Sequence, residues 1–213
     1  MPSVAVIDYG MGNLHSIAKA LQHADPGTHV QITADAQAIE AADRVVFPGV
    51  GAIRDCMQAL QQLGLIELIQ QAAQTKPFLG ICLGMQAMLT DSEENDGVSC
   101  LDVLPGHVRR FANDLRNDQG EILKIPHMGW NRVQQKPHPL WQGIAQDSRF
   151  YFVHSYYVVP DRDADSIATS DYPSPFTCAL ARDNVFAVQF HPEKSQVVGL
   201  RLLQNFLRWN GAA

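Results

Sequence analysis

The stretch FLGICLGMQ, residues 78–86, joins a short apolar run to the start of an apolar helix through two glycines. The run contains no charged side chain, and apolar residues predominate as far as Leu89. Gly80 and Gly84 stand two positions before and two positions after Cys82. This spacing permits a tight reversal of the chain, because larger side chains would collide there. The stretch therefore predicts a strand, a sharp turn that carries a cysteine, and a helix.

Two earlier segments have the same organisation, each with an apolar run, a glycine-containing turn and a helical repeat of apolar residues. Their ranges are 4–7, 8–13 and 14–21 in the first copy, and 44–47, 48–51 and 53–60 in the second. Repeated strand–helix units predict an α/β fold of flavodoxin-like type, with a mostly parallel central sheet flanked by helices on both faces. Such sheets carry their sites at the carboxyl ends of the strands.

The second half of the chain predicts added antiparallel strands, because short apolar segments alternate there with turns. We expect strands at 106–109, 124–125, 150–153 and 167–169, and a hairpin of 177–180 and 185–190 around the turn 182–184. The last helix is expected at 195–209. Its apolar stripe is expected to contain Val197, Leu200, Leu203 and Leu207.

The composition favours a single soluble domain over residues 1–213. A hydrophobic content of 46% supports a globular chain with a substantial core. The net charge of −6, without a basic block, argues against binding to nucleic acid or anionic membranes. No segment approaches the roughly 18 to 20 apolar residues of a membrane span, and the first residues lack a signal-peptide pattern, so we expect a cytoplasmic protein.

Cys82 is the strongest candidate for a reactive group. A nucleophile elbow would hold its side chain in a strained turn, and the following helix start supplies free N–H groups that favour a thiolate. The alternative is that Cys82 is a small buried apolar residue, as most free cysteines are. Cys56 on a helical apolar face and Cys178 in a strand are expected to be buried. The four cysteines are too widely spaced to suggest a zinc ribbon or a disulfide framework.

A base and an orienting carboxylate follow the expected strand at 185–190. His191 would stand at the carboxyl end of that strand, and Glu193 comes two positions later, across Pro192. With Cys82 they would supply a nucleophile, its base and the group that fixes the imidazole tautomer. The alternative is that His191 caps a strand and Glu193 begins the last helix.

An oxyanion hole requires backbone N–H groups near the nucleophile. The N–H of Leu83 directly follows Cys82. The turn PGVG (48–51) ends a neighbouring strand, and its glycines allow an amide to point toward the site. The alternative for this turn is an ordinary strand–helix connection.

Together these motifs resemble a known family. GICLGMQ (80–86) with HPEK (191–194) is similar to the class I, triad-type glutamine amidotransferases, which hydrolyse glutamine to glutamate and ammonia, and the resemblance covers nearly the whole chain. Four motifs resemble the branch that serves imidazole glycerol phosphate synthesis in histidine biosynthesis: DYGMGN (8–13), PGVG (48–51), PHMGWN (126–131) and YFVHSY (151–156). The rivals are the branches for anthranilate, guanylate and pyridoxal phosphate synthesis, from which PHMGWN separates this chain.

The resemblance implies roles for individual residues. Cys82, His191 and Glu193 would form the catalytic triad, and the amides of Val50 and Leu83 the oxyanion hole. The implied glutamine-binding residues are Gly51, Gln86, Ser155 and Tyr156. No metal or organic cofactor is implied.

The resemblance also implies a partner, a (β/α)8 cyclase that forms a heterodimer with the glutaminase. This cyclase, a lyase, would combine the ammonia with a phosphorylated aminoimidazole ribonucleotide precursor. The interface candidates are Asn13, His127, Met128, Trp130 and Lys194. We expect residues 127, 128 and 130 to be exposed. They would then suit an interface, where Trp and Met are enriched. The alternatives are that these three pack a local loop and that Asn13 caps the first helix. The isolated chain is expected to turn over glutamine poorly. The flexible turn 48–51 can point either an amide or a carbonyl at the site, so partner binding would complete the oxyanion hole.

Two other classes of function remain open. A stand-alone cysteine hydrolase or peptidase would share the elbow and the histidine. Its chemistry would not require Gln86, the pair Ser155–Tyr156 or the Trp130 motif. A non-catalytic binding subunit is disfavoured because the triad pattern and both glycines are intact.

Overall fold

The computed structural model describes residues 1–117 and 119–212. The first half contains β1 (Ser3–Ile7), α1 (Leu14–Ala24), β2 (His29–Thr33), α2 (Ala36–Ala41), β3 (Arg44–Gly49), α3 (Ile53–Gln62), α4 (Ile66–Thr75), β4 (Phe78–Cys82), α5 (Leu83–Ala87), β5 (Asp91–Ser92), the 3-10 helix η1 (Glu94–Asp96), β6 (Val98–Ser99) and β7 (Gly106–Arg110). The second half contains β8 (His127–Arg132), β9 (Gln134–Gln135), η2 (Pro139–Trp141), β10 (Arg149–His154), β11 (Tyr156–Pro160), η3 (Asp163–Asp165), β12 (Ser166–Asp171), β13 (Pro175–Arg182), β14 (Val185–Val188), η4 (Pro192–Lys194) and α6 (Gln196–Arg208).

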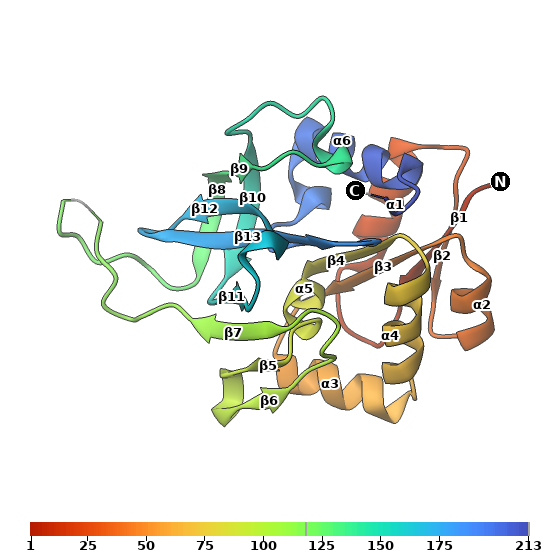
Figure 1. Ribbon diagram of the computed structural model, residues 1–213, viewed down its shortest axis with the longest axis horizontal. Helices are drawn as coiled ribbons and strands as arrows, with labels where there is room; N and C mark the ends of the chain where they lie inside the picture. Colours follow the sequence, from red (N-terminus) through yellow and green to blue (C-terminus); the bar gives the residue numbers. More distant parts are fainter. Residues whose placement is uncertain (118, 213) are drawn as a thin grey trace.

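The main sheet has a parallel part and an antiparallel part (Figure 1). Strands β2, β1, β3, β4 and β14 lie side by side and run parallel. From β14 the sheet continues antiparallel through β13, β11 and β7. The expected fold class and the hairpin of β13 and β14 are thus confirmed. Strands β8 and β10 form a separate two-stranded ribbon.

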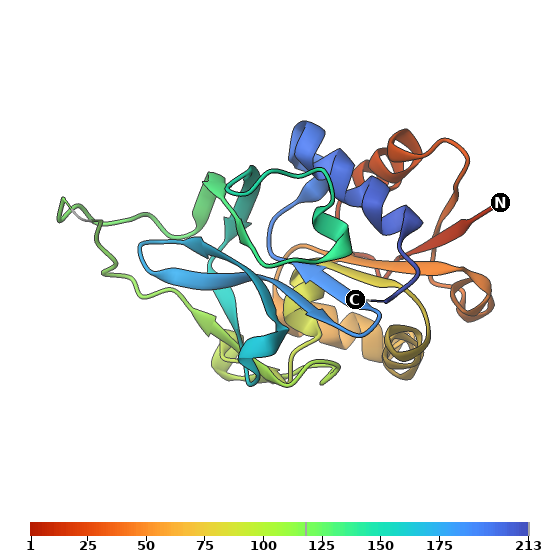
Figure 2. The same cartoon turned by 45° about the horizontal axis from the view of Figure 1, so that its top comes forward.

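Helices cover both faces of the parallel part. Figures 1 and 2 show α1 and α6 together over one face, and α3, α4 and α5 over the other. Alternate residues of β1 pack into the two cores, because successive side chains of a strand point to opposite faces. Val4 and Val6 join the cluster under α1 and α6, while Ala5 and Ile7 join the other cluster. This two-sided burial explains why β1 is apolar from Val4 to Ile7. Among the described residues, the helices are all too short or too polar to cross a membrane.

Three expectations about elements were incomplete or wrong. Residues 124–125 are not a strand; the carbonyl of Lys124 instead accepts a hydrogen bond from the hydroxyl of Tyr172, and the strand begins only at His127. Strand β2 and helices α2 and α4 were not predicted. Of the expected stripe of α6, Leu203 and Leu207 are buried, but Val197 is 78% exposed, because Leu202 and Phe206 complete the face turned toward the core.

Candidate active site

The turn after β4 holds Cys82 in a strained backbone conformation. Cys82 has φ +54° and ψ −110°, which L-residues rarely adopt, and helix α5 begins at the next residue. A Cβ on Gly84 would lie 1.9 Å from the carbonyl oxygen of Phe47, and one on Gly80 would lie 2.8 Å from the sulfur of Met88. The two glycines therefore allow α5 to press against β3 and β4, and the expected strand–turn–helix is confirmed.

The turn at residues 48–51 lies next to this cysteine. The register of β3 and β4 pairs Gly49 with Cys82, so Val50 directly follows the residue opposite the thiol. The hydroxyl of Tyr9 donates a hydrogen bond of 3.1 Å to the carbonyl of Pro48, which anchors the turn from the buried side. Val50 itself is 40% exposed.

His191 and Glu193 form a buried pair. The carboxylate oxygen Oε1 of Glu193 lies 2.9 Å from Nδ1 of His191, and the two side chains are 3% and 5% exposed. Burial lowers the pKa of His191, but the nearby Cys82 and Glu193 outweigh it and raise the pKa to about 10. Nε2, the other ring nitrogen, is buried without a hydrogen-bond partner among the described residues. It is therefore the nitrogen available to Cys82 and to a ligand.

Ser195 fixes the segment that carries His191 and Glu193. This role of Ser195 was not identified from the sequence. Its hydroxyl donates to the carbonyl of His191 at 2.6 Å and accepts from the N–H of Tyr151 at 3.0 Å. The N–H of His191 donates in turn to the carbonyl of Tyr151 at 2.9 Å. Strand β14 ends at Val188, and Glu193 belongs to η4 rather than to α6. The histidine is thus held against β10.

A cavity of about 270 Å³ brings most of the expected residues together. Its lining consists of Val50, Gly51, Cys82, Leu83, Gln86, Glu94, Val153, His154, Ser155, Tyr156, His191 and Lys194. Glu94, Val153 and His154 were not expected. Glu94 reaches the cavity from η1 and accepts a hydrogen bond from the N–H of Ile53, at the beginning of α3. No sequence pattern links residue 94 to this turn, because the contact depends on the packing of η1 against α3.

The other thiols are poor candidates for a nucleophile. Cys56 and Cys178 are fully buried, as expected. Burial raises the pKa of Cys56 to about 12 and that of Cys178 further still. Cys100 is half-buried, and burial raises its pKa to about 12 as well. All four cysteines are free, and of these only Cys82 lines the cavity.

His127 is not exposed, contrary to expectation. It is 4% exposed, and its ring stacks on Tyr172 and Phe152 at centroid distances of 4.1 Å and 5.0 Å. Its Nδ1 lies 2.9 Å from Nε2 of His154. Burial lowers the pKa of His127 to about 4 and that of His154 to about 3. Strand β8 turns residue 127 inward because it alternates with its neighbours across the ribbon, so packing, the alternative for this residue, is what the structure has.

The remaining interface candidates lie at the surface. Met128 and Trp130 are 61% and 43% exposed on β8. The ammonium group of Lys194 lies 5.8 Å from the ring centroid of Tyr151. Asn13 is exposed at the start of α1, and its side chain makes no capping hydrogen bond there. The capping alternative for Asn13 therefore does not apply.

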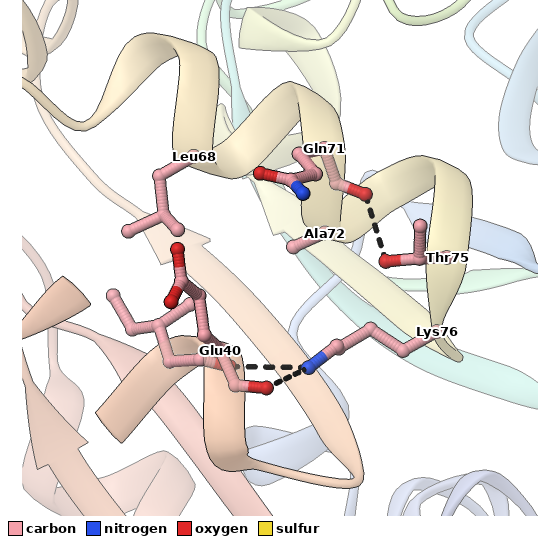
Figure 3. A pocket seen from close by; sticks show the side chains of 7 residues that line it. Glu40, Leu68, Gln71, Ala72, Thr75 and Lys76 are labelled. Carbon is pink, nitrogen blue, oxygen red and sulfur yellow. Dashed lines mark hydrogen bonds between the residues drawn. The ribbon is translucent and has the colours of Figure 1, made fainter. Parts of the chain in front are cut away.

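A second cavity, of about 320 Å³, lies between α2 and α4 (Figure 3), and Cys82 is not among its lining residues. Lys76 donates there to the carbonyl oxygens of Glu40 and Ala42 at 2.6 Å and 2.8 Å. These carbonyls lie at the end of α2, so the lysine satisfies helix-terminal acceptors. The ammonium group of Lys76 is therefore engaged by backbone carbonyls of the protein itself.

Comparisons with known proteins agree with this fold. The imidazole glycerol phosphate synthase subunit HisH of Methylococcus capsulatus is 64% identical, over 98% of this chain and 97% of its own. The subunit HisH of Nitrosococcus oceani is 58% identical over the whole of both chains. The crystal structure of a putative GMP synthase subunit from Thermoplasma acidophilum superposes with a TM-score of 0.70 at 19% identity, covering 98% of this chain and 93% of that one. A family model for glutamine amidotransferase class-I matches residues 5–209. The chain belongs to the class-I glutamine amidotransferases.

Proposed function

We propose that the chain is the glutaminase subunit of imidazole glycerol phosphate synthase, as one domain over residues 1–213. It hydrolyses glutamine to glutamate and ammonia and passes the ammonia to a cyclase in histidine biosynthesis. The observation that carries the chemistry is the single cavity lined by Cys82 and His191, with Glu193 at 2.9 Å from the imidazole. The substrate and the pathway are supported by full-length relatives that are named as subunits of this synthase.

In the proposed reaction, the thiolate of Cys82 attacks the side-chain amide carbon of glutamine. His191 protonates the departing ammonia, leaving a γ-glutamyl thioester on the sulfur. Water, deprotonated by His191, then releases glutamate and restores the thiol. Glu193 holds Nδ1 of the ring, so that Nε2 is the nitrogen that transfers the proton.

The oxyanion of each tetrahedral intermediate is proposed to bind the amides of Val50 and Leu83. Leu83 follows the nucleophile at the start of α5, and Val50 follows the residue paired with it across β3 and β4. Two backbone donors on adjacent elements can converge on one oxygen without any side-chain movement.

Glutamine itself is proposed to contact Gly51, Gln86, Ser155 and Tyr156, which all line the cavity. To these we add Glu94, whose carboxylate reaches the same cavity and is chemically suited to the α-ammonium group of an amino acid. An acidic side chain at this position favours the binding of a free amino acid, which carries an α-ammonium group, over that of an amide without such a group.

The partner is proposed to be a (β/α)8 cyclase that forms a cytoplasmic heterodimer with this chain, a complex with lyase activity. Its docking surface would include Asn13, Met128, Trp130 and Lys194, while the buried His127 is excluded. Exposed Val197 lines a surface cavity of about 420 Å³ together with Trp130 and Arg149, which extends the apolar part of this surface. Large exposed apolar side chains of this kind are common where a partner binds.

The test is glutamate production from glutamine by the purified chain, alone and with the cyclase and its nucleotide ligand. We expect weak activity alone, strong activation in the complex and none with Cys82→Ala. Cys100→Ala is the matched control, because this thiol lies outside the cavity, and it should keep the activity. Turnover that persists in Cys82→Ala, or none under any condition, would reject the proposal.

A further inference from the structure

Gln189 is a fully buried polar side chain beside the thiol. It follows β14, two residues before His191, and is 0% exposed. Its amide nitrogen Nε2 lies 3.7 Å from the sulfur of Cys82, and its Oε1 accepts a hydrogen bond of 2.9 Å from Nε2 of Gln86. Burying an amide is costly unless both of its ends are paired. Both ends of this amide therefore have a defined partner, and one partner is the reacting atom.

A backbone carbonyl fixes the direction of these bonds. The carbonyl oxygen of Tyr156 can only accept, and Nε2 of Gln86 lies 3.2 Å from it, so Gln86 must present its NH₂ group there. The same NH₂ group faces Gln189, which must therefore present its oxygen to Gln86. The NH₂ group of Gln189 is then left to face the sulfur. A flipped Gln189 would place two NH₂ groups against each other.

The same carbonyl also accepts a hydrogen bond from the buried histidine pair. Nδ1 of His154 lies 2.7 Å from the Tyr156 oxygen and donates to it, because the oxygen cannot donate. Nε2 of His154 is then an acceptor for Nδ1–H of His127, 2.9 Å away. The Tyr156 carbonyl thus accepts two hydrogen bonds, and the histidine pair holds the oxygen that anchors Gln86.

We propose that Gln189 donates an N–H to the sulfur of Cys82 and so stabilises and aims the thiolate, and that Gln86 is a positioning residue that holds the Gln189 amide in this orientation. The hydrogen bond to a charged acceptor is stronger than one to the neutral thiol, so it favours ionisation. This inference rests on the proposed function only in that it takes Cys82 as the nucleophile.

Other titratable groups also lie around the sulfur. His191, just before η4, interacts with the sulfur and with Glu193, and Tyr9 follows β1 with its hydroxyl bonded to Pro48. Glu94, His154 and Lys194 line the same cavity. These groups remain in place when Gln189 is changed, so a substitution there isolates the effect of the amide.

The test is the rate at which iodoacetamide alkylates Cys82 in the full chain between pH 5 and 10, followed by mass spectrometry of the peptide that contains it. Only the thiolate reacts, so the profile gives the pKa of this thiol without glutamine or a partner. We expect Gln189→Leu to raise that pKa by about one to two units. Gln189→Glu, which differs by one atom, should raise it further because a carboxylate repels the thiolate. Gln86→Leu should give a smaller rise.

Asn184→Leu is the matched control. This amide precedes β14 and donates to the carbonyls of Ala73 and Lys76, at the opposite end of the strand from the thiol. It should lower the melting temperature yet leave the Cys82 profile unchanged. If Gln189→Leu does not fold, Gln189→Met, which is similar in length, uncharged and also lacks the N–H donor, carries the test. An unchanged thiol pKa in the folded Gln189 variants would overturn the inference. Because alkylation does not involve glutamine, failure of the glutaminase assay would leave this result standing.

Discussion

Two buried pairs that contain histidine each contribute one ring to the lining of the Cys82 cavity, and they have opposite electrostatics. His191 pairs with the carboxylate of Glu193, and its pKa is raised to about 10. His127 pairs with His154, and burial lowers their pKa values to about 4 and about 3. All of these rings are less than 7% exposed. Burial therefore does not decide the charge of an imidazole here; the chemical partner does.

The difference corresponds to two kinds of work. A protonated His191 can give its proton to a leaving group, and the Glu193 carboxylate compensates its charge. The neutral pair gives and receives hydrogen bonds in one fixed direction, from Nδ1–H of His127 to His154 and on to the carbonyl of Tyr156. One pair is suited to move a proton, and the other to hold the cavity wall in place.

The largest expected effect comes from removing the carboxylate. Glu193→Gln keeps the shape but no longer stabilises the imidazolium, so kcat/KM for glutamine in the complex with the cyclase should fall by about 10³-fold. The pKa of His191, followed by NMR, should fall at the same time. Glu121→Gln, an exposed change in the loop between β7 and β8, serves as control. Activity within threefold of the unchanged protein would contradict the role of Glu193.

A second experiment separates the two influences on His191. Cys82→Ala removes the sulfur that helps to raise its pKa, while Glu193 remains. The pKa should move from about 10 toward the ordinary value of about 6.5 and stay above that of His127. NMR titration of the imidazole protons measures both rings in one sample. If the His191 value does not change, the thiol is not coupled to this ring.

The neutral pair should make the protein sensitive to acid. The folded pKa values of His127 and His154 lie below the unfolded value of about 6.5, so the unfolded chain takes up protons first as the pH falls. The free energy of unfolding should therefore decrease from pH 6.5 toward pH 4, by on the order of 2 kcal/mol for each ring. Denaturant titrations at several pH values measure this slope. His127→Phe should flatten it, whereas Phe152→Leu should lower stability equally at every pH.

His191 acts in the opposite direction. Its folded pKa lies above the unfolded value, so its stabilising contribution is complete below pH 6.5 and is lost as the pH rises toward 10. The same denaturant titrations, extended to pH 10, should show a decline that is smaller in Glu193→Gln. A stability that keeps rising up to pH 10 would contradict this assignment.

The smallest expected effect concerns the outer surface of the ribbon. Trp130→Ala should change the stability of the isolated chain by less than about 1 kcal/mol, because this side chain is half-exposed. It should weaken cyclase binding much more, as measured by titration calorimetry. Val159→Ala is the control. Val159 is also apolar and exposed but lies on β11, so this change should leave binding unchanged. Equal binding by both variants would place the interface elsewhere.

Much of the fold was predictable because local patterns and tertiary packing agree. The three strand–turn–helix units around β1, β3 and β4 appear in the sequence as apolar runs followed by glycines, since parallel strands are buried on both faces. Strand β2 was missed because its exposed edge residues interrupt the apolar run. Val197 was misplaced because, at about 100° per residue, it lies about 120° around the helix from Leu203, outside the face of α6 that Gly199, Leu202 and Phe206 turn toward the core.

By itself the sequence determined the elbow around Cys82, the HPE motif at residues 191–193 and the α/β class, because each depends on residues that are close together along the chain. Only the tertiary structure decided which way His127 faces, that Glu94 reaches the cavity, and that Gln189 lies against the sulfur. Gln189 and Cys82 are 107 residues apart. Their contact arises from the parallel pairing of β4 with β14, and such long-range pairing leaves no local signal in the sequence.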